Sequence, residues 1–126
     1  MEQPMQPVRV LVANHPRLMR ELVLAAISDQ PDVEIVSEIQ DEAEIREAVE
    51  RTLPDFLIIS LERTEERPKI CDVLLSQHPT MKILALAPER NSGIFYWTTR
   101  DIRATRIESS EKGILRALRS ITPWMV

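Results

Sequence analysis

The chain has 126 residues, a formal net charge of -4 and 44% hydrophobic residues, which is typical of one acidic globular domain with a single core. One cysteine and two histidines exclude a disulfide framework and a zinc site built from these ligands. The charges of both signs are interspersed, which argues against direct nucleic-acid contact, and no apolar run approaches membrane-spanning length. We therefore expect a cytoplasmic protein that does not contact membranes, with Cys71 as a buried, unreactive thiol.

The two ends of the chain differ in composition from the segment between them. Residues 1–7 contain neither a basic head nor an apolar segment, so we expect a disordered lead-in rather than a targeting signal. Residues 8–122 carry a continuous pattern and predict one domain, and residues 123–126 predict a short tail.

The first half of the domain alternates apolar runs of strand length with amphipathic segments of helix length. We predict a strand over 8–13, a helix over 17–29, a more polar strand over 33–39 and a helix over 41–52. The next run, over 54–61, is bounded by proline and by charged residues. It predicts the buried central strand of the sheet.

The second half continues this alternation with less regular segments. We predict a helix over 68–77, a strand over 81–87, a short or irregular helix over 92–99 and a strand over 103–107. A final amphipathic helix should follow a capping serine, Ser109 or Ser110, and reach Ile121. The inward faces of the helices are expected to include Leu22, Leu53 and Val73.

Strands that alternate with helices are joined by right-handed crossovers, and they form a parallel sheet that helices cover on both faces. We therefore predict an α/β fold, a flavodoxin-like three-layer sandwich. Its expected sheet has five parallel strands in the order 2-1-3-4-5, with five helices.

In order and spacing, the segments of this chain resemble the receiver domains of two-component response regulators, the CheY-like superfamily. The most similar receivers are those that precede a helix-turn-helix output domain. The resemblance covers nearly the whole chain and is carried by residues 8–13 with the following His15-Pro16, and by residues 30–36, 54–59, 78–84 and 110–121.

The resemblance also implies where a phosphorylation pocket would lie. Receivers use an acidic pair after the first strand, an aspartate after the third, a hydroxyl after the fourth and a lysine after the fifth. In this sequence these positions fall on Asn14, His15, Ser60, Ala87 and Ile107. Magnesium needs hard anionic oxygen ligands and an acyl phosphate needs a carboxylate. We therefore expect a pseudo-receiver that has no metal site, no cofactor and no phosphoryl transfer.

Two alternatives remain for the same pocket. The vacated site could bind a small ligand or another ion. A hydrolase could instead use Ser60 as nucleophile and His15 as base. The sequence around Ser60 lacks a Gly-x-Ser-x-Gly elbow and an oxyanion-hole glycine pair, so we expect no catalytic residue and no enzyme activity.

The remaining candidate is a surface for protein contacts. In receivers the fourth helix, the fifth strand and the last helix form dimers and bind partners, and here this surface would include Tyr96, Trp97, Arg103 and Arg106. One helix cannot bury three consecutive aromatic residues, so at least one of them should be exposed. We expect a phosphorylation-independent module of signal transduction or transcription regulation that binds a protein partner or itself.

Overall fold

The computed structural model describes residues 7–14, 17–61, 67–87, 92–98 and 102–119, apart from the side chains of Arg17, Leu18 and Glu42. The tail predicted over 123–126 lies outside the described residues, as does the lead-in predicted over 1–7, except for Pro7.

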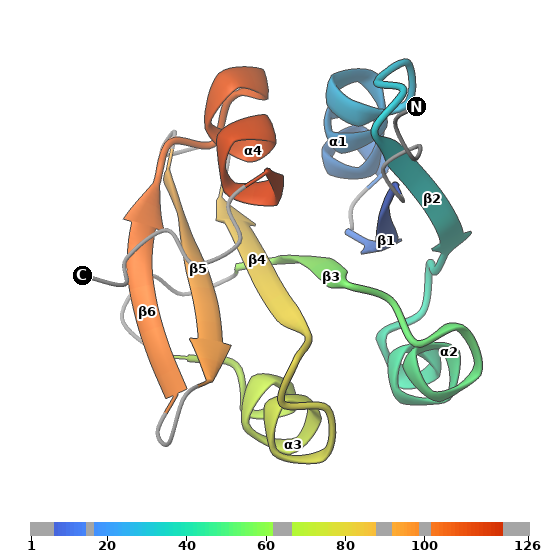
Figure 1. Cartoon of the computed structure of the whole chain (residues 1–126), viewed down its shortest axis with the longest axis vertical. Helices are drawn as coiled ribbons and strands as arrows, with labels where there is room; N and C mark the ends of the chain where they lie inside the picture. Colours follow the sequence, from blue (N-terminus) through green and yellow to red (C-terminus); the bar gives the residue numbers. More distant parts are fainter. Residues whose placement is uncertain (1–6, 15–16, 62–66, 88–91, 99–101, 120–126) are drawn as a thin grey trace, which may run out of the picture.

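One mixed sheet runs through the middle of the molecule (Figure 1). Its six strands are β1 (Val8–Ala13), β2 (Val33–Glu38), β3 (Phe56–Ser60), β4 (Lys82–Ala87), β5 (Ser92–Thr98) and β6 (Ile102–Ile107). They lie in the order β2-β1-β3-β4-β5-β6. The first four strands in this order are parallel, whereas β5 is antiparallel to β4, and β6 is antiparallel to β5. In consequence β6 points the same way as β1, β3 and β4.

Helices cover both faces of the sheet (Figure 1). The described residues form α1 (Arg17–Ile27), the short 3-10 helix η1 (Glu42–Glu44), α2 (Ile45–Thr52), α3 (Lys69–Gln77) and α4 (Glu111–Leu118). The helices α1 and α4 lie on one face, and α2 and α3 lie on the other. This arrangement confirms the predicted three-layer α/β class.

The helix predicted over 92–99 was wrong, because residues 92–98 form the whole of β5. The predicted set of five parallel strands and five helices was therefore wrong as well. Side chains of a strand alternate between the two faces of a sheet. Phe95 packs into the core on the α1 and α4 face, and Tyr96 packs into the core on the α2 and α3 face. Since helices cover both faces, consecutive aromatic residues can both be buried.

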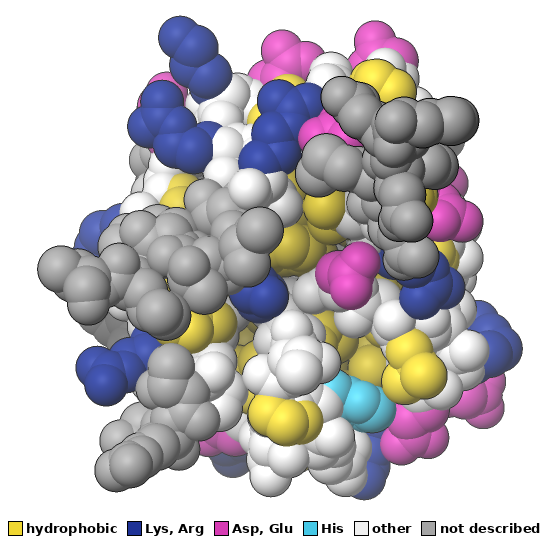
Figure 2. Space-filling model, viewed as in Figure 1, with side chains coloured by type: hydrophobic (Ala, Val, Ile, Leu, Met, Phe, Trp, Pro, Cys, Tyr) yellow, Lys and Arg dark blue, Asp and Glu magenta, His cyan; other side chains and the backbone are white. Residues whose placement is uncertain are grey.

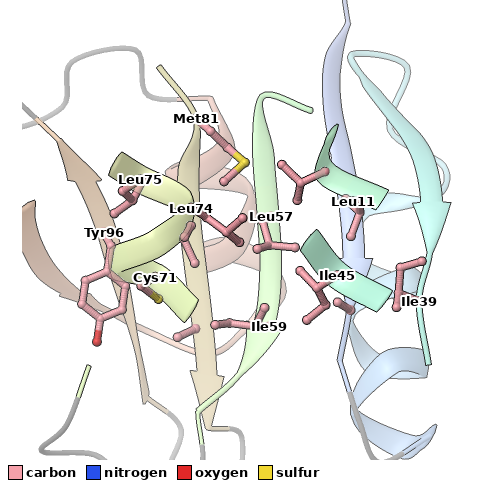
Figure 3. Close-up of a cluster of buried hydrophobic side chains, with 14 of the residues drawn as sticks. Leu11, Ile39, Ile45, Leu57, Ile59, Cys71, Leu74, Leu75, Met81 and Tyr96 are labelled. Atoms are coloured by element: carbon pink, nitrogen blue, oxygen red, sulfur yellow. The ribbon is translucent and has the colours of Figure 1, made fainter. Parts of the chain in front are cut away.

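Each face of the sheet has its own hydrophobic core. Figure 3 shows the core under α2 and α3, where Tyr96 reaches from β5 toward Cys71 on α3. Three side chains predicted to face inward are exposed instead, namely Leu22, Leu53 and Val73. Leu53 is the capping residue that follows α2, and its left-handed backbone conformation, with φ of 48°, directs the chain away from the helix.

Candidate functional site

The carboxyl ends of three adjacent strands bring together three of the predicted pocket positions. Asn14 follows β1, Ser60 ends β3 and Ala87 ends β4. The register pairs Ala13 with Ile59 and Ser60 with Leu86, so these strand ends lie at one level of the sheet. This is the edge at which open α/β sheets bind their ligands.

The fifth predicted position lies apart from this group. Ile107 ends β6, which pairs with β5, and β5 separates β6 from β4. Two strand spacings amount to about 10 Å across the sheet. The resemblance-based placement of Ile107 in the pocket is therefore corrected, because the added strand β5 moves the end of β6 away from Ser60. His15 lies outside the described residues, so its proximity to Ser60 stays a prediction.

Asn14 is the most unusual polar residue at this edge. Its side chain is fully buried, and within the described part of the chain neither its amide nitrogen nor its amide oxygen has a hydrogen-bond partner. A buried polar group without a partner typically costs about 1–3 kcal/mol of stability. The edge therefore holds a neutral hydrogen-bonding group at the position where a receiver would carry a negative charge.

Metal ligands are sparse among the described residues. No group of three or more His, Cys, Asp or Glu side chains lies close enough together there to hold a metal ion. Ala87, which is buried, presents only a methyl group where a receiver would present a hydroxyl. The described side chains at this edge can donate and accept hydrogen bonds, but they supply no carboxylate for a phosphoryl group.

The predicted interaction surface is changed by the strand that replaces the fourth helix. Tyr96 is only 3% exposed, so its placement on a partner-binding surface is corrected. Trp97 is partly buried against Phe95, with 5.5 Å between the ring centroids. Arg103 and Arg106 are exposed on β6. The accessible part of this region is thus an edge strand rather than a helical face.

Burial also decides the chemistry of the two ionisable groups in the core between α3 and β5. Loss of solvation raises the pKa of the Cys71 thiol to about 12 and the pKa of the Tyr96 phenol to about 12. Both groups are therefore neutral at physiological pH. Cys71 is a packing residue there rather than a nucleophile.

Among the residues that the structure describes, no helix is long and apolar enough to cross a membrane.

Comparisons with known proteins agree with the fold. No family model matches the chain. Over 56 residues it is 39% identical to a protein-glutamate methylesterase/protein-glutamine glutaminase of Rhizobium johnstonii and 38% identical to one of Rhizobium etli. These matches cover 44% of this chain and only 16% of each relative. The chain therefore matches a small part of these two proteins.

A solved structure gives the broader match. The signal receiver domain of NarL, described as a response regulator of Mycobacterium tuberculosis, is 26% identical, with a TM-score of 0.55. The match covers 64% of this chain and 66% of that domain. Together with the order β2-β1-β3-β4 and the helices on both faces, this likeness identifies the chain as a receiver-like domain of the CheY-like superfamily.

Proposed function

We propose that this domain is a pseudo-receiver, a signalling module that works through protein contacts and without phosphoryl transfer. The observation that carries the proposal is the presence of Asn14 and Ser60 at the ends of β1 and β3. Magnesium and an acyl phosphate both require carboxylates at these positions. An amide and a hydroxyl cannot replace them.

The setting of this role also belongs to the proposal. The likeness to a response regulator's receiver supports a role in signal transduction or transcription regulation. The single cysteine is a buried free thiol, which fits the cytoplasm. We propose no catalytic activity for the domain, and the activity named for the methylesterase relatives is that of proteins of which it matches a small part.

The test is exposure to acetyl phosphate, or to beryllofluoride, in the presence of magnesium. We expect no added phosphoryl mass and no change in the amide NMR spectrum, because the carboxylates that would bind magnesium and accept the phosphoryl group are missing. The NarL receiver is the positive control. A double variant, Asn14→Asp with Ser60→Asp, should gain magnesium binding. Phosphorylation of the unmodified domain would overturn the proposal.

A second candidate function is the binding of a neutral polar ligand at the same edge. The buried, unpartnered amide of Asn14 favours it, because a bound hydrogen-bonding group would remove the cost of that burial. Native mass spectrometry of the purified protein would detect such a ligand. Without a ligand, Asn14→Leu should raise the free energy of unfolding by about 1–3 kcal/mol, whereas a loss of stability would show that the amide is satisfied.

A further inference from the structure

The strand β6 forms one outer edge of the sheet. Among the described residues it pairs only with β5, and the opposite edge of the sheet is formed by β2 (Figure 1). In an antiparallel pair, every second residue directs its backbone N–H and C=O away from the partner strand. The outer side of β6 thus carries a row of backbone donors and acceptors that another extended chain can pair with.

The charge of this edge differs from that of the whole chain. β6 contains Arg103 and Arg106 and no acidic residue, whereas the chain has a net charge of -4. Both arginines are exposed, and neither forms an ion pair within the described part of the chain. In Figure 2, Lys and Arg side chains gather on the side of α4 and β6, and acidic side chains are more frequent toward β2 and α2.

The two arginines lie on opposite faces of the sheet. Arg103 pairs in register with Trp97, which packs toward α1 and α4, and Arg106 pairs with Ile94, which packs toward α2 and α3. Residues directly opposite one another on neighbouring strands share a face. A strand added to β6 can therefore match both arginines only if its acidic residues are an odd number of positions apart.

A second copy of this chain is a poor occupant of the edge. Antiparallel pairing of β6 with itself would bring four arginines and no carboxylate from either strand to the junction. Charged side chains on an edge strand discourage such pairing, and like charges close to one another oppose it. The charge of β6 therefore selects against self-association and in favour of an acidic strand.

We propose that β6 binds an extended acidic segment of a partner protein as an added strand, with two acidic residues three positions apart. One carboxylate would lie beside Arg103 on one face, and the other would lie beside Arg106 on the other face. The inference deepens the proposed function, because it names the chemistry of the partner. The phosphorylation test is independent of it, so either result can fail alone.

The experiment uses the full chain with Trp124→Phe, so that Trp97, the cross-strand neighbour of Arg103, is the single fluorescent tryptophan. The probe is a short peptide of threonine and valine with two glutamates three positions apart. Its matched control has the same composition with the glutamates two positions apart, so that both lie on one face. We expect roughly fivefold tighter binding of the first peptide, since only it satisfies both arginines.

Two further changes separate strand pairing from general charge attraction. N-methylation of the peptide residues whose N–H groups face β6 should abolish binding, while N-methylation of the alternate residues should not. Charge reversal with Arg103→Glu and Arg106→Glu should reverse the preference toward a peptide with lysines in place of glutamates. Both residues are exposed, so the charge-reversed variant should fold, and circular dichroism would check this. The milder double variant Arg103→Gln with Arg106→Gln should also weaken binding of the glutamate peptide.

Four results would overturn the proposal. The first is equal affinity for the two spacings of glutamate. The second is unchanged binding of the peptide that is methylated toward β6. The third is equally tight binding of a DNA duplex, which would show that the edge attracts polyanions rather than strands. A dimer of the peptide-free protein that the Arg→Gln variants abolish would assign the edge to a second copy instead, and would also overturn it.

Discussion

The parallel part of the sheet and the β5–β6 hairpin are built differently although they share one pair of cores. In the parallel part, β3 and β4 are almost entirely buried, and their carboxyl ends meet β1 at the candidate site. In the hairpin, the residues of β5 are buried or half-buried, and those of β6 are half-buried or exposed. A receiver-like fold can thus keep the strand arrangement around its candidate site while the strands beyond β4 are rebuilt.

The hairpin's dependence on both cores predicts the largest effect. Phe95→Ala should lower the free energy of unfolding by about 3–5 kcal/mol, because the ring is fully buried between Phe56 and Trp97. Tyr96→Ala should have a comparable effect on the opposite face. Arg103→Ala is the exposed control and should change stability by less than about 0.5 kcal/mol. Denaturant unfolding measures the stability of all three variants. A neutral result for Phe95 or Tyr96 would contradict the burial of these side chains on the two faces of β5.

A second effect tests the contact between the hairpin and α3. The thiol and phenol ionise near 9.0 and 10.0 when unfolded, but Cys71 and Tyr96 both have a native pKa of about 12. Above pH 9 the unfolded state therefore binds fewer protons than the native state, so stability is full below pH 9 and falls toward pH 12. Thermal unfolding across this range should show the decline. Tyr96→Phe and Cys71→Ala should each reduce the decline of stability with pH. An unchanged decline in both variants would contradict the raised pKa values of these two groups.

Because β5 lies close to β4, the sign of the stability change on substitution of Gly93 shows whether this residue lies in a strand or in a helix. A β-carbon on Gly93 would lie 2.8 Å from the carbonyl oxygen of Ala85 and 2.9 Å from a methyl of Leu86. Gly93→Ala should therefore destabilise the protein by about 1–3 kcal/mol. In a helix the same substitution would stabilise by about 1 kcal/mol. Chemical denaturation decides between these two signs, with Ala104→Ser as the near-neutral control on β6.

The smallest effect lies where the hairpin leads into α4. The Ser110 hydroxyl accepts a hydrogen bond from the Gly113 backbone N–H at 3.1 Å. Ser110→Ala should cost about 1 kcal/mol. The neighbouring Ser109 hydroxyl is buried, and within the described residues it has no partner, so Ser109→Ala should be neutral or stabilising. A larger loss from Ser109→Ala than from Ser110→Ala would show that the cap had been assigned to the wrong serine.

The sequence was informative about the parallel part because strands buried on both faces appear as short, continuous apolar runs. The runs over 8–13, 54–61 and 81–87 were confirmed as β1, β3 and β4. The hairpin was missed for a different reason. Ile94, Phe95 and their neighbours favour strands, but the alternation of strand and helix in the preceding segments predicts a helix at this point.

The candidate site was predictable only in part. Asn14, Ser60 and Ala87 could be placed together because each follows or ends a strand of the parallel sheet. Ile107 could not be placed, because its position depends on how many strands separate β6 from β4. The isolation of the Asn14 amide also leaves no pattern in the sequence, since it depends on which groups of other segments surround the side chain.

The position of β5 between β4 and β6 limits what substitutions at the candidate site could achieve. Acidic residues placed at positions 14 and 60 would lie at the ends of adjacent strands, because β1 and β3 are neighbours. A lysine at position 107 would remain about two strand widths from β4, beyond easy reach of a group held on β3. Bringing a lysine near a group held on β3 would therefore require a change in the strand order as well as in the side chains.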